Sequence, residues 1–264
     1  MAALTILGES RDLWIASLDR GTLSRLTTSE ATEFDPVWSS DGRELFYVLD
    51  RPPFELQRTT ADGIDAGRPI WKDPAKLDTT SIAVSPDGRT IGFQIHADKT
   101  GRDIYARPLD GSGPAQTLRS SRSEERNVSF SPDGAWIVYQ SDELGHPEIY
   151  AQPFSGPGER TQLSESGGTD PVWARNGEVF YLHEHEVRVV AARPAGRVAF
   201  GASRALFSYP ITPGTIHESQ TFDVTRDGTR IIAVTIPEAS RPRQVEIVTD
   251  WARELERVAP RASR

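Results

Sequence analysis

A set of polar residues recurs at one place in a repeating pattern of this sequence. Each lies six residues before an Asp or Asn that is followed by Gly: Asp35, Ser81, Asn127, Asp170 and Thr221. The segments just upstream add further polar side chains, at Glu33, Glu125, His217 and Glu218. If the repeats surround a common axis, these groups converge. Carboxylate and amide oxygens suit a hard cation such as Ca²⁺, which takes roughly six to eight oxygen ligands.

The sequence therefore predicts a site for Ca²⁺ or another divalent metal, with its ligands at Asp35, Asn127, Asp170, Glu33, Glu125 and Glu218. A structural alternative stays open. Short polar side chains also cap strand ends and bond to neighbouring backbone, and that role needs no ligand.

Histidines supply a second set of candidates. His183 and His185 lie two residues apart at the end of an apolar run, so in a strand they share one face and could bind a transition metal. With His217, they are the candidate catalytic residues. The same kind of loop carries His96, Asp98, Asp142, Glu143 and His146. A solvated loop is the alternative interpretation of all these positions.

The elements that position these residues are short strands in tandem units. The turn residues Asp41, Asp87, Asp133, Asn176 and Asp227 are spaced by 46, 46, 43 and 51 residues. Apolar alternation before Asp-Gly or Asn-Gly, and a β-branched or aromatic run after it, predict a tight β-hairpin. A third strand follows, as in "DIYARPL" and "EIYAQPF", and then a shorter fourth strand such as "AQTLR".

Four strands in each unit of this length are typical of a β-propeller blade. We expect an all-β, single-domain propeller over residues 1–264, with six four-stranded blades of which the first and the last are incomplete. The units are residues 1–28, 29–74, 75–120, 121–165, 166–208 and 209–250, and a short helix is expected at 251–259. The first unit lacks its innermost strand. The turn Asp residues are expected to be structural, and Trp38, Phe130 and Trp173 are expected in the core.

Composition narrows the possible partners. The net charge of −8 disfavours binding to a phosphate backbone. The chain has no cysteine, which excludes a thiolate nucleophile and a Cys-ligated zinc. No apolar stretch approaches the roughly 20 residues of a spanning helix, and no signal peptide is visible. As given, the chain is expected in the cytoplasm, whereas a longer parent protein could place the propeller outside the inner membrane.

The motif "SPDG", repeated at residues 85–88 and 131–134 and followed by "IGF" or "IVY" and then by "DIY" or "EIY", resembles the TolB-like, WD-repeat-like propellers. The order of "GHPEIYAQPFSGPGERTQLSESGGTDPVW", "TFDVTRDGTRIIAV" and "VEIVTDWARELERV" is closer still to the C-terminal propeller of bacterial serine/threonine protein kinases. The resemblance implies the fold and a binding or scaffolding role. The kinase domain itself is absent, because no Gly-rich loop, "HRD" or "DFG" occurs.

Two functions from different classes remain. The first is a sensor or scaffold module that binds a small molecule, peptide or protein on the channel face. The second is a metal-dependent hydrolase of lactones, esters or phosphotriesters with a cation in the central channel, by analogy with six-bladed enzymes. A serine hydrolase is not expected, because no G-x-S-x-G motif occurs. Open strand edges in the incomplete blades also predict a homo-oligomer.

Overall fold

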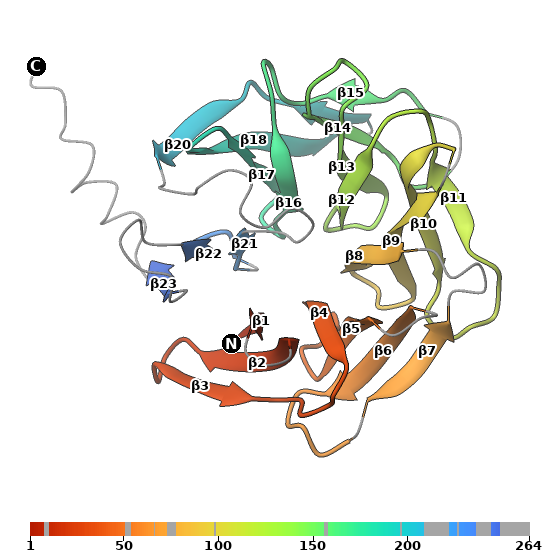
Figure 1. Cartoon of the computed structure of the whole chain (residues 1–264). Coiled ribbons are helices and arrows are strands. Elements are labelled where there is room, and N and C mark those ends of the chain that lie inside the picture. The colour runs from red at the N-terminus through yellow and green to blue at the C-terminus, as the bar shows by residue number, and fades with distance from the viewer. Residues whose placement is uncertain are drawn as a thin grey trace, which may run out of the picture.

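The chain folds into antiparallel sheets arranged around a common centre (Figure 1). The computed structural model describes residues 1–7, 11–50, 54–65, 67–72, 78–97, 99–155, 158–195, 197–208, 222–225, 227–235 and 244–248. Strands are the only regular elements within these ranges, and none of their residues forms a helix that could cross a membrane. The helix expected at 251–259 lies outside the described residues.

Six sheets follow one another along the chain and are numbered here in that order. Sheet 1 contains β1 (Ala2–Leu7), β2 (Arg11–Ser17) and β3 (Thr22–Arg25). Sheet 2 contains β4 (Thr32–Trp38), β5 (Glu44–Asp50), β6 (Glu55–Thr60) and β7 (Arg68–Lys72). Sheet 3 contains β8 (Asp78–Val84), β9 (Thr90–Ala97), β10 (Gly101–Pro108) and β11 (Gln116–Arg119).

The remaining strands form the second half of the ring. Sheet 4 contains β12 (Glu125–Phe130), β13 (Trp136–Ser141), β14 (Glu148–Pro153) and β15 (Thr161–Gln162). Sheet 5 contains β16 (Thr169–Trp173), β17 (Glu178–His183), β18 (Glu186–Ala195), β19 (Arg197–Phe200) and β20 (Arg204–Ser208). Sheet 6 contains β21 (Phe222–Val224), β22 (Ile231–Thr235) and β23 (Gln244–Val248).

Sheet 5 differs from the four-stranded pattern expected from the sequence. Its long strand β18 pairs with β20 through residues 186–189 and with β19 through residues 192–195. Because β18 is ten residues long, its first half can pair with β20 while its second half pairs with β19.

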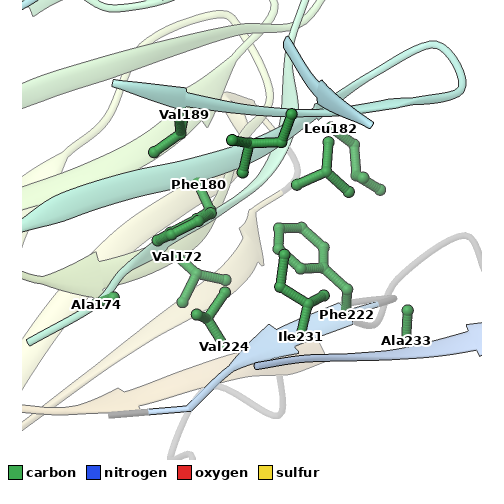
Figure 2. Close-up of a cluster of buried hydrophobic side chains, with 11 residues drawn as sticks. Val172, Ala174, Phe180, Leu182, Val189, Phe222, Val224, Ile231 and Ala233 are labelled. Atoms are coloured by element: carbon green, nitrogen blue, oxygen red, sulfur yellow. The ribbon is translucent and has the colours of Figure 1, made fainter. Parts of the chain in front are cut away.

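The hydrophobic core lies between the sheets, as in a β-propeller. Five buried clusters are found among the described residues, and each draws its side chains from two successive sheets. Figure 2 shows one of them, in which Phe222, Val224 and Ile231 of sheet 6 face Phe180 and Leu182 of sheet 5. The expected core residues Phe130 and Trp173 are buried, whereas Trp38 is only half-buried. The fold is an all-β propeller.

The recurring Asp-Gly turn joins the first two strands of a sheet at the end opposite the start of the inner strand. In sheet 4, Ser131 Oγ donates to Asp133 Oδ1 at 2.6 Å, and Ala135 N donates to the same oxygen at 3.0 Å. These hydrogen bonds lower the pKa of Asp133. The same Ser–Asp bond, also at 2.6 Å, closes the turns at Asp41 and Asp87. The turn carboxylates are therefore structural.

Gly134 provides a test of the backbone requirement in this turn. Its φ is +70°, and an added Cβ would have space, because the nearest atom is Pro86 Cδ at 3.6 Å. We expect Gly134→Ala to lower the free energy of unfolding by about 1–2 kcal/mol, which is the cost of the left-handed region for a residue with a Cβ. Urea denaturation measures it. Gly113→Ala is the matched control, because Gly113 lacks a positive φ and its Cβ would make only an ordinary contact at 3.7 Å. Equal losses in the two variants would contradict the explanation.

Candidate functional site

The residues of the predicted polar ring have the same backbone conformation in sheets 2, 3, 4 and 5. Asp35, Ser81, Asn127 and Asp170 have φ values of 52°, 44°, 54° and 54°. The pairing register of each inner strand with the next strand shifts at this position, as in a β-bulge. Asn and Asp tolerate the left-handed region better than most residues. The residue types at the ring are therefore explained in part by the backbone.

The backbone N–H groups of the ring residues in sheets 3, 4 and 5 each donate a hydrogen bond to a side chain of the preceding sheet. Ser81 N donates to Asp35 Oδ2 at 2.8 Å. Asn127 N donates to Gln94 Oε1 of β9 at 3.2 Å. Asp170 N donates to Gln140 Oε1 of β13 at 3.4 Å. These bonds form a belt that connects sheets 2, 3, 4 and 5.

Side chains at the ring also meet directly. Asn127 Nδ2 donates to Asp170 Oδ1 at 2.6 Å, so the structure brings these two predicted metal ligands together. Both residues are buried. Asn127 Oδ1 is buried and accepts no hydrogen bond from any described residue.

The glutamates just upstream lie between sheets. Ser29 Oγ donates to Glu33 Oε1 at 2.9 Å, and Ser121 Oγ donates to Glu125 Oε1 at 2.5 Å. Burial raises the pKa of both carboxyl groups. The negative charge of Asp12 on β2 adds to this effect at Glu33.

Glu125, like Glu33, is affected by an aspartate of the preceding sheet. Asp103 on β10 raises its pKa further, whereas the charge of Arg119 opposes the shift. The two buried glutamates are thus arranged in the same way: the pKa of each is raised further by an aspartate near the start of a strand in the preceding sheet, Asp12 of β2 for Glu33 and Asp103 of β10 for Glu125.

The described histidines lie at the same end of the sheets as the ring, His96 and His183 near the ends of β9 and β17 and His146 and His185 in the loops that follow second strands. His183 Nδ1 lies 3.0 Å from the carbonyl oxygen of Gly167, and His185 is exposed. His146 Nε2 lies 3.3 Å from Glu148 Oε1, and His96 is exposed. His217, Glu218, Thr221 and Asp98 lie outside the described residues.

The acidic residues of the loop between β13 and β14, Asp142 and Glu143, make hydrogen bonds and ion pairs with neighbouring residues. Asp142 Oδ1 accepts a hydrogen bond from Glu124 N at 2.8 Å. Glu143 binds Arg160 through both carboxylate oxygens and also accepts from Arg119 Nη2 at 3.2 Å. Among the residues that the structure describes, no three His, Cys, Asp or Glu side chains are grouped to hold a metal ion. Asn127 and Asp170 are predicted ligands that a direct side-chain hydrogen bond joins.

The sequence interpretation missed several residues that build this site. Gln94 and Gln140 end the runs "IGFQ" and "IVYQ", so their recurrence was visible, but their partners on the next unit were not. Arg175, which lies at the turn end of the sheets and not at the ring, was also missed. Its Nη2 donates to the carbonyl oxygen of Ser40 at 3.2 Å, which joins the turn after β16 to the turn after β4.

Comparison with known proteins agrees with this architecture. No protein-family model matches the chain. A TolB homolog from Chlorobium luteolum is 27% identical over 148 residues, which are 53% of this chain and 31% of that protein. The crystal structure of TolB from Acinetobacter baumannii superposes with a TM-score of 0.67 at 20% identity, covering 90% of this chain and 57% of that one.

An enzyme shares the architecture as well. A gluconolactonase from Xanthomonas campestris superposes with a TM-score of 0.59 at 18% identity, covering 84% of this chain and 74% of that one. Propellers of this type thus carry different activities, and structural likeness at this level of identity defines the fold alone. The fold is that of a TolB-like β-propeller, and the chain spans less than two thirds of both the Chlorobium luteolum protein and the Acinetobacter baumannii TolB chain.

The buried glutamates make the stability of the protein depend on pH. Because the pKa of Glu125 is raised in the folded state, ionisation of Glu125 costs stability as pH rises through its unfolded and then its folded pKa. We expect Glu125→Gln to match the wild type near pH 3 and to gain stability relative to it towards pH 7. Urea denaturation across this range measures the difference.

Glu143→Gln is the control with the opposite sign. Hydrogen bonds from Arg160 lower the pKa of Glu143, so its carboxylate stabilises the fold at neutral pH and loses this effect as pH falls through the folded pKa. A relative stability of Glu125→Gln that stays constant from pH 3 to 7 would contradict the burial of an ionised Glu125.

Proposed function

We propose that this chain is a binding or scaffold module that holds a peptide or protein segment on the ring face, meaning the face at which the inner strands begin. The TolB-like fold supports this proposal. The belt of hydrogen bonds supports it further, because it fixes the ring as a rigid frame and leaves recognition to the loops around it.

The observation that carries the proposal is the loop between β13 and β14. Inner strands run away from the ring face, so the loop between the second and third strands returns to that face. There Leu144 is 57% exposed, with the exposed His146 two residues later. His96 near the end of β9 and Glu184 in the turn after β17 are exposed at the corresponding ends of sheets 3 and 5. An exposed leucine beside imidazole and carboxylate groups offers the combination of apolar and polar contacts that protein interfaces make.

The proposal also covers how the six sheets form one propeller and what kind of protein contains it. We take the six sheets to be the six blades of one propeller, with Arg230 Nη1 of sheet 6 lying 3.9 Å from Asp19 Oδ1 of sheet 1 at the junction of the ends. The motif order supports a sensor propeller like the C-terminal propeller of bacterial serine/threonine protein kinases, and a longer parent protein could place such a propeller outside the inner membrane. Self-association through incomplete sheets remains a prediction.

A peptide library selected against the purified chain tests the ring face. We expect selected peptides to lose at least about tenfold in affinity for Leu144→Asp, because the contact replaces water around an apolar side chain and a charge restores the hydration. Fluorescence anisotropy with a labelled peptide measures the dissociation constant.

Leu23→Asp is the matched control. Leu23 is the comparable exposed leucine, at 46%, but it lies on β3 at the outer edge of sheet 1. Peptides that bind both variants as tightly as the wild type, or a library that yields no binder, would contradict a peptide-binding ring face.

The metal-dependent hydrolase is the second candidate function. Its specific support is the buried Asn127 Oδ1, which accepts no hydrogen bond from a described residue and lies on the same side chain that binds Asp170. Metal analysis of the purified protein and assays on lactones, esters and phosphotriesters test this candidate. It predicts a bound divalent ion and an activity that chelation and Asn127→Ala both remove. Activity that is insensitive to chelation, or no bound metal, would exclude it.

A further inference from the structure

The loop between β13 and β14 is tied to the chain on both sides of sheet 4. Asp142 Oδ1 accepts a hydrogen bond at 2.8 Å from Glu124 N, in the segment that leads from sheet 3 into sheet 4. The carbonyl oxygen of Pro147 accepts one, also at 2.8 Å, from Gly168 N, in the segment that leads from sheet 4 into sheet 5. The exposed Leu144 lies between these two attachments. Both ends of the loop are therefore fixed relative to the neighbouring sheets.

The residue next to Leu144 is held by two arginines. Arg160, directly before β15, binds the carboxylate of Glu143 with both terminal nitrogens, and its Nη1 lies 2.6 Å from Glu143 Oε2. Arg119, at the end of β11 in sheet 3, donates from Nη2 to the same oxygen at 3.2 Å. A forked arginine–carboxylate pair fixes direction as well as distance. Glu143 is thus a third attachment of the loop, one residue from Leu144.

Arg160 is itself supported by an aromatic ring. Its guanidinium carbon lies 4.3 Å from the centroid of the Tyr150 ring, which is within the range of a cation–π interaction. Tyr150 is buried on β14. The position of the guanidinium group that binds Glu143 is therefore set by sheet 4 and not by the surrounding solvent.

We propose that Arg160, assisted by Arg119, is a positioning residue for peptide binding at the ring face. By holding Glu143, the two arginines fix the backbone that carries Leu144, so the leucine meets a partner segment already in its bound orientation. Fixing a contact residue before binding raises affinity, because less conformational freedom is lost in the complex. This inference rests on the peptide-binding function proposed above and adds how its contact residue is held.

A double-mutant cycle with Leu144 isolates the positioning role. The probe is a labelled library-selected peptide whose affinity depends on Leu144, and fluorescence anisotropy measures its dissociation constant. We expect Arg160→Met to weaken binding about two- to tenfold, which is the range for ordering one side chain and its backbone on binding. Arg160→Lys, which keeps the charge but not the fork, should lose less. In the chain with Leu144→Ala, Arg160→Met should have no further effect on affinity.

Hydrogen exchange tests the attachment of the loop without any peptide. Gly145 N donates to the carbonyl oxygen of Asp142 at 2.8 Å within the loop. We expect Arg160→Met to speed exchange at the Gly145 amide and to leave exchange in the centre of β13 unchanged, because the sheet stays folded while the loop opens.

Arg68→Met is the matched control, because it breaks the ion pair with Asp65 near the turn between β6 and β7, at the end of the sheets opposite the ring. It should leave peptide affinity unchanged. Unchanged affinity or unchanged Gly145 exchange in Arg160→Met would overturn the positioning role and leave the peptide function standing. An equal loss in the Leu144→Ala chain would overturn it as well, because Arg160 would then act without Leu144. The absence of any peptide that depends on Leu144 would overturn both proposals.

Discussion

The structure depends on one backbone constraint: each of the inner strands β4, β8, β12 and β16 carries a residue in the left-handed region, and the N–H of such a residue must be satisfied from outside its own strand. The bulge at this residue interrupts pairing with the second strand, so the ladder of its own sheet does not provide the acceptor. Buried N–H groups are nearly always paired. The preceding sheet provides the acceptor at Ser81, Asn127 and Asp170. The geometry of one sheet is thereby tied to its neighbour.

Because of this constraint, the side chains of the polar ring have a structural role, which is to hydrogen-bond neighbouring sheets to each other. Asp35 is an acceptor for the next sheet, and Asn127 and Asp170 bind each other. Beneath the belt, buried apolar clusters fill the space between successive sheets. The belt and the clusters together explain how loops of variable sequence can be held at fixed positions around the ring. A polypeptide partner would meet these loops first and the belt only afterwards.

Much of the fold could be predicted from the sequence because its signals are local. An Asp-Gly turn requires a positive φ and closes with its own Ser, so "SPDG" marks a hairpin without reference to the rest of the chain. Counting back from it located the ring residues, and the all-β propeller was predicted correctly. The capping alternative for these side chains agrees with their observed bonds.

What the sequence could not show depends on contacts between units. Gln94 accepts from a residue 33 positions later, and Glu125 lies beside Asp103 only because two sheets stack. The bond from Arg175 to Ser40 joins turns 135 residues apart. No local pattern encodes such pairs. The second partner of β18 was missed for a related reason, since the length of a strand sets how many neighbours it can have.

Native-state hydrogen exchange at the ring amides tests the central claim most directly. Gln94 Oε1 accepts from Asn127 N, whereas Gln140 Oε1 accepts from Asp170 N, so the two caps can be separated. With Gln94→Leu, the account predicts faster exchange at Asn127, unchanged exchange at Asp170, and a loss in stability of about 1–3 kcal/mol from the unsatisfied N–H. Unchanged protection of Asn127 in this variant would contradict the claim that the preceding sheet holds the ring.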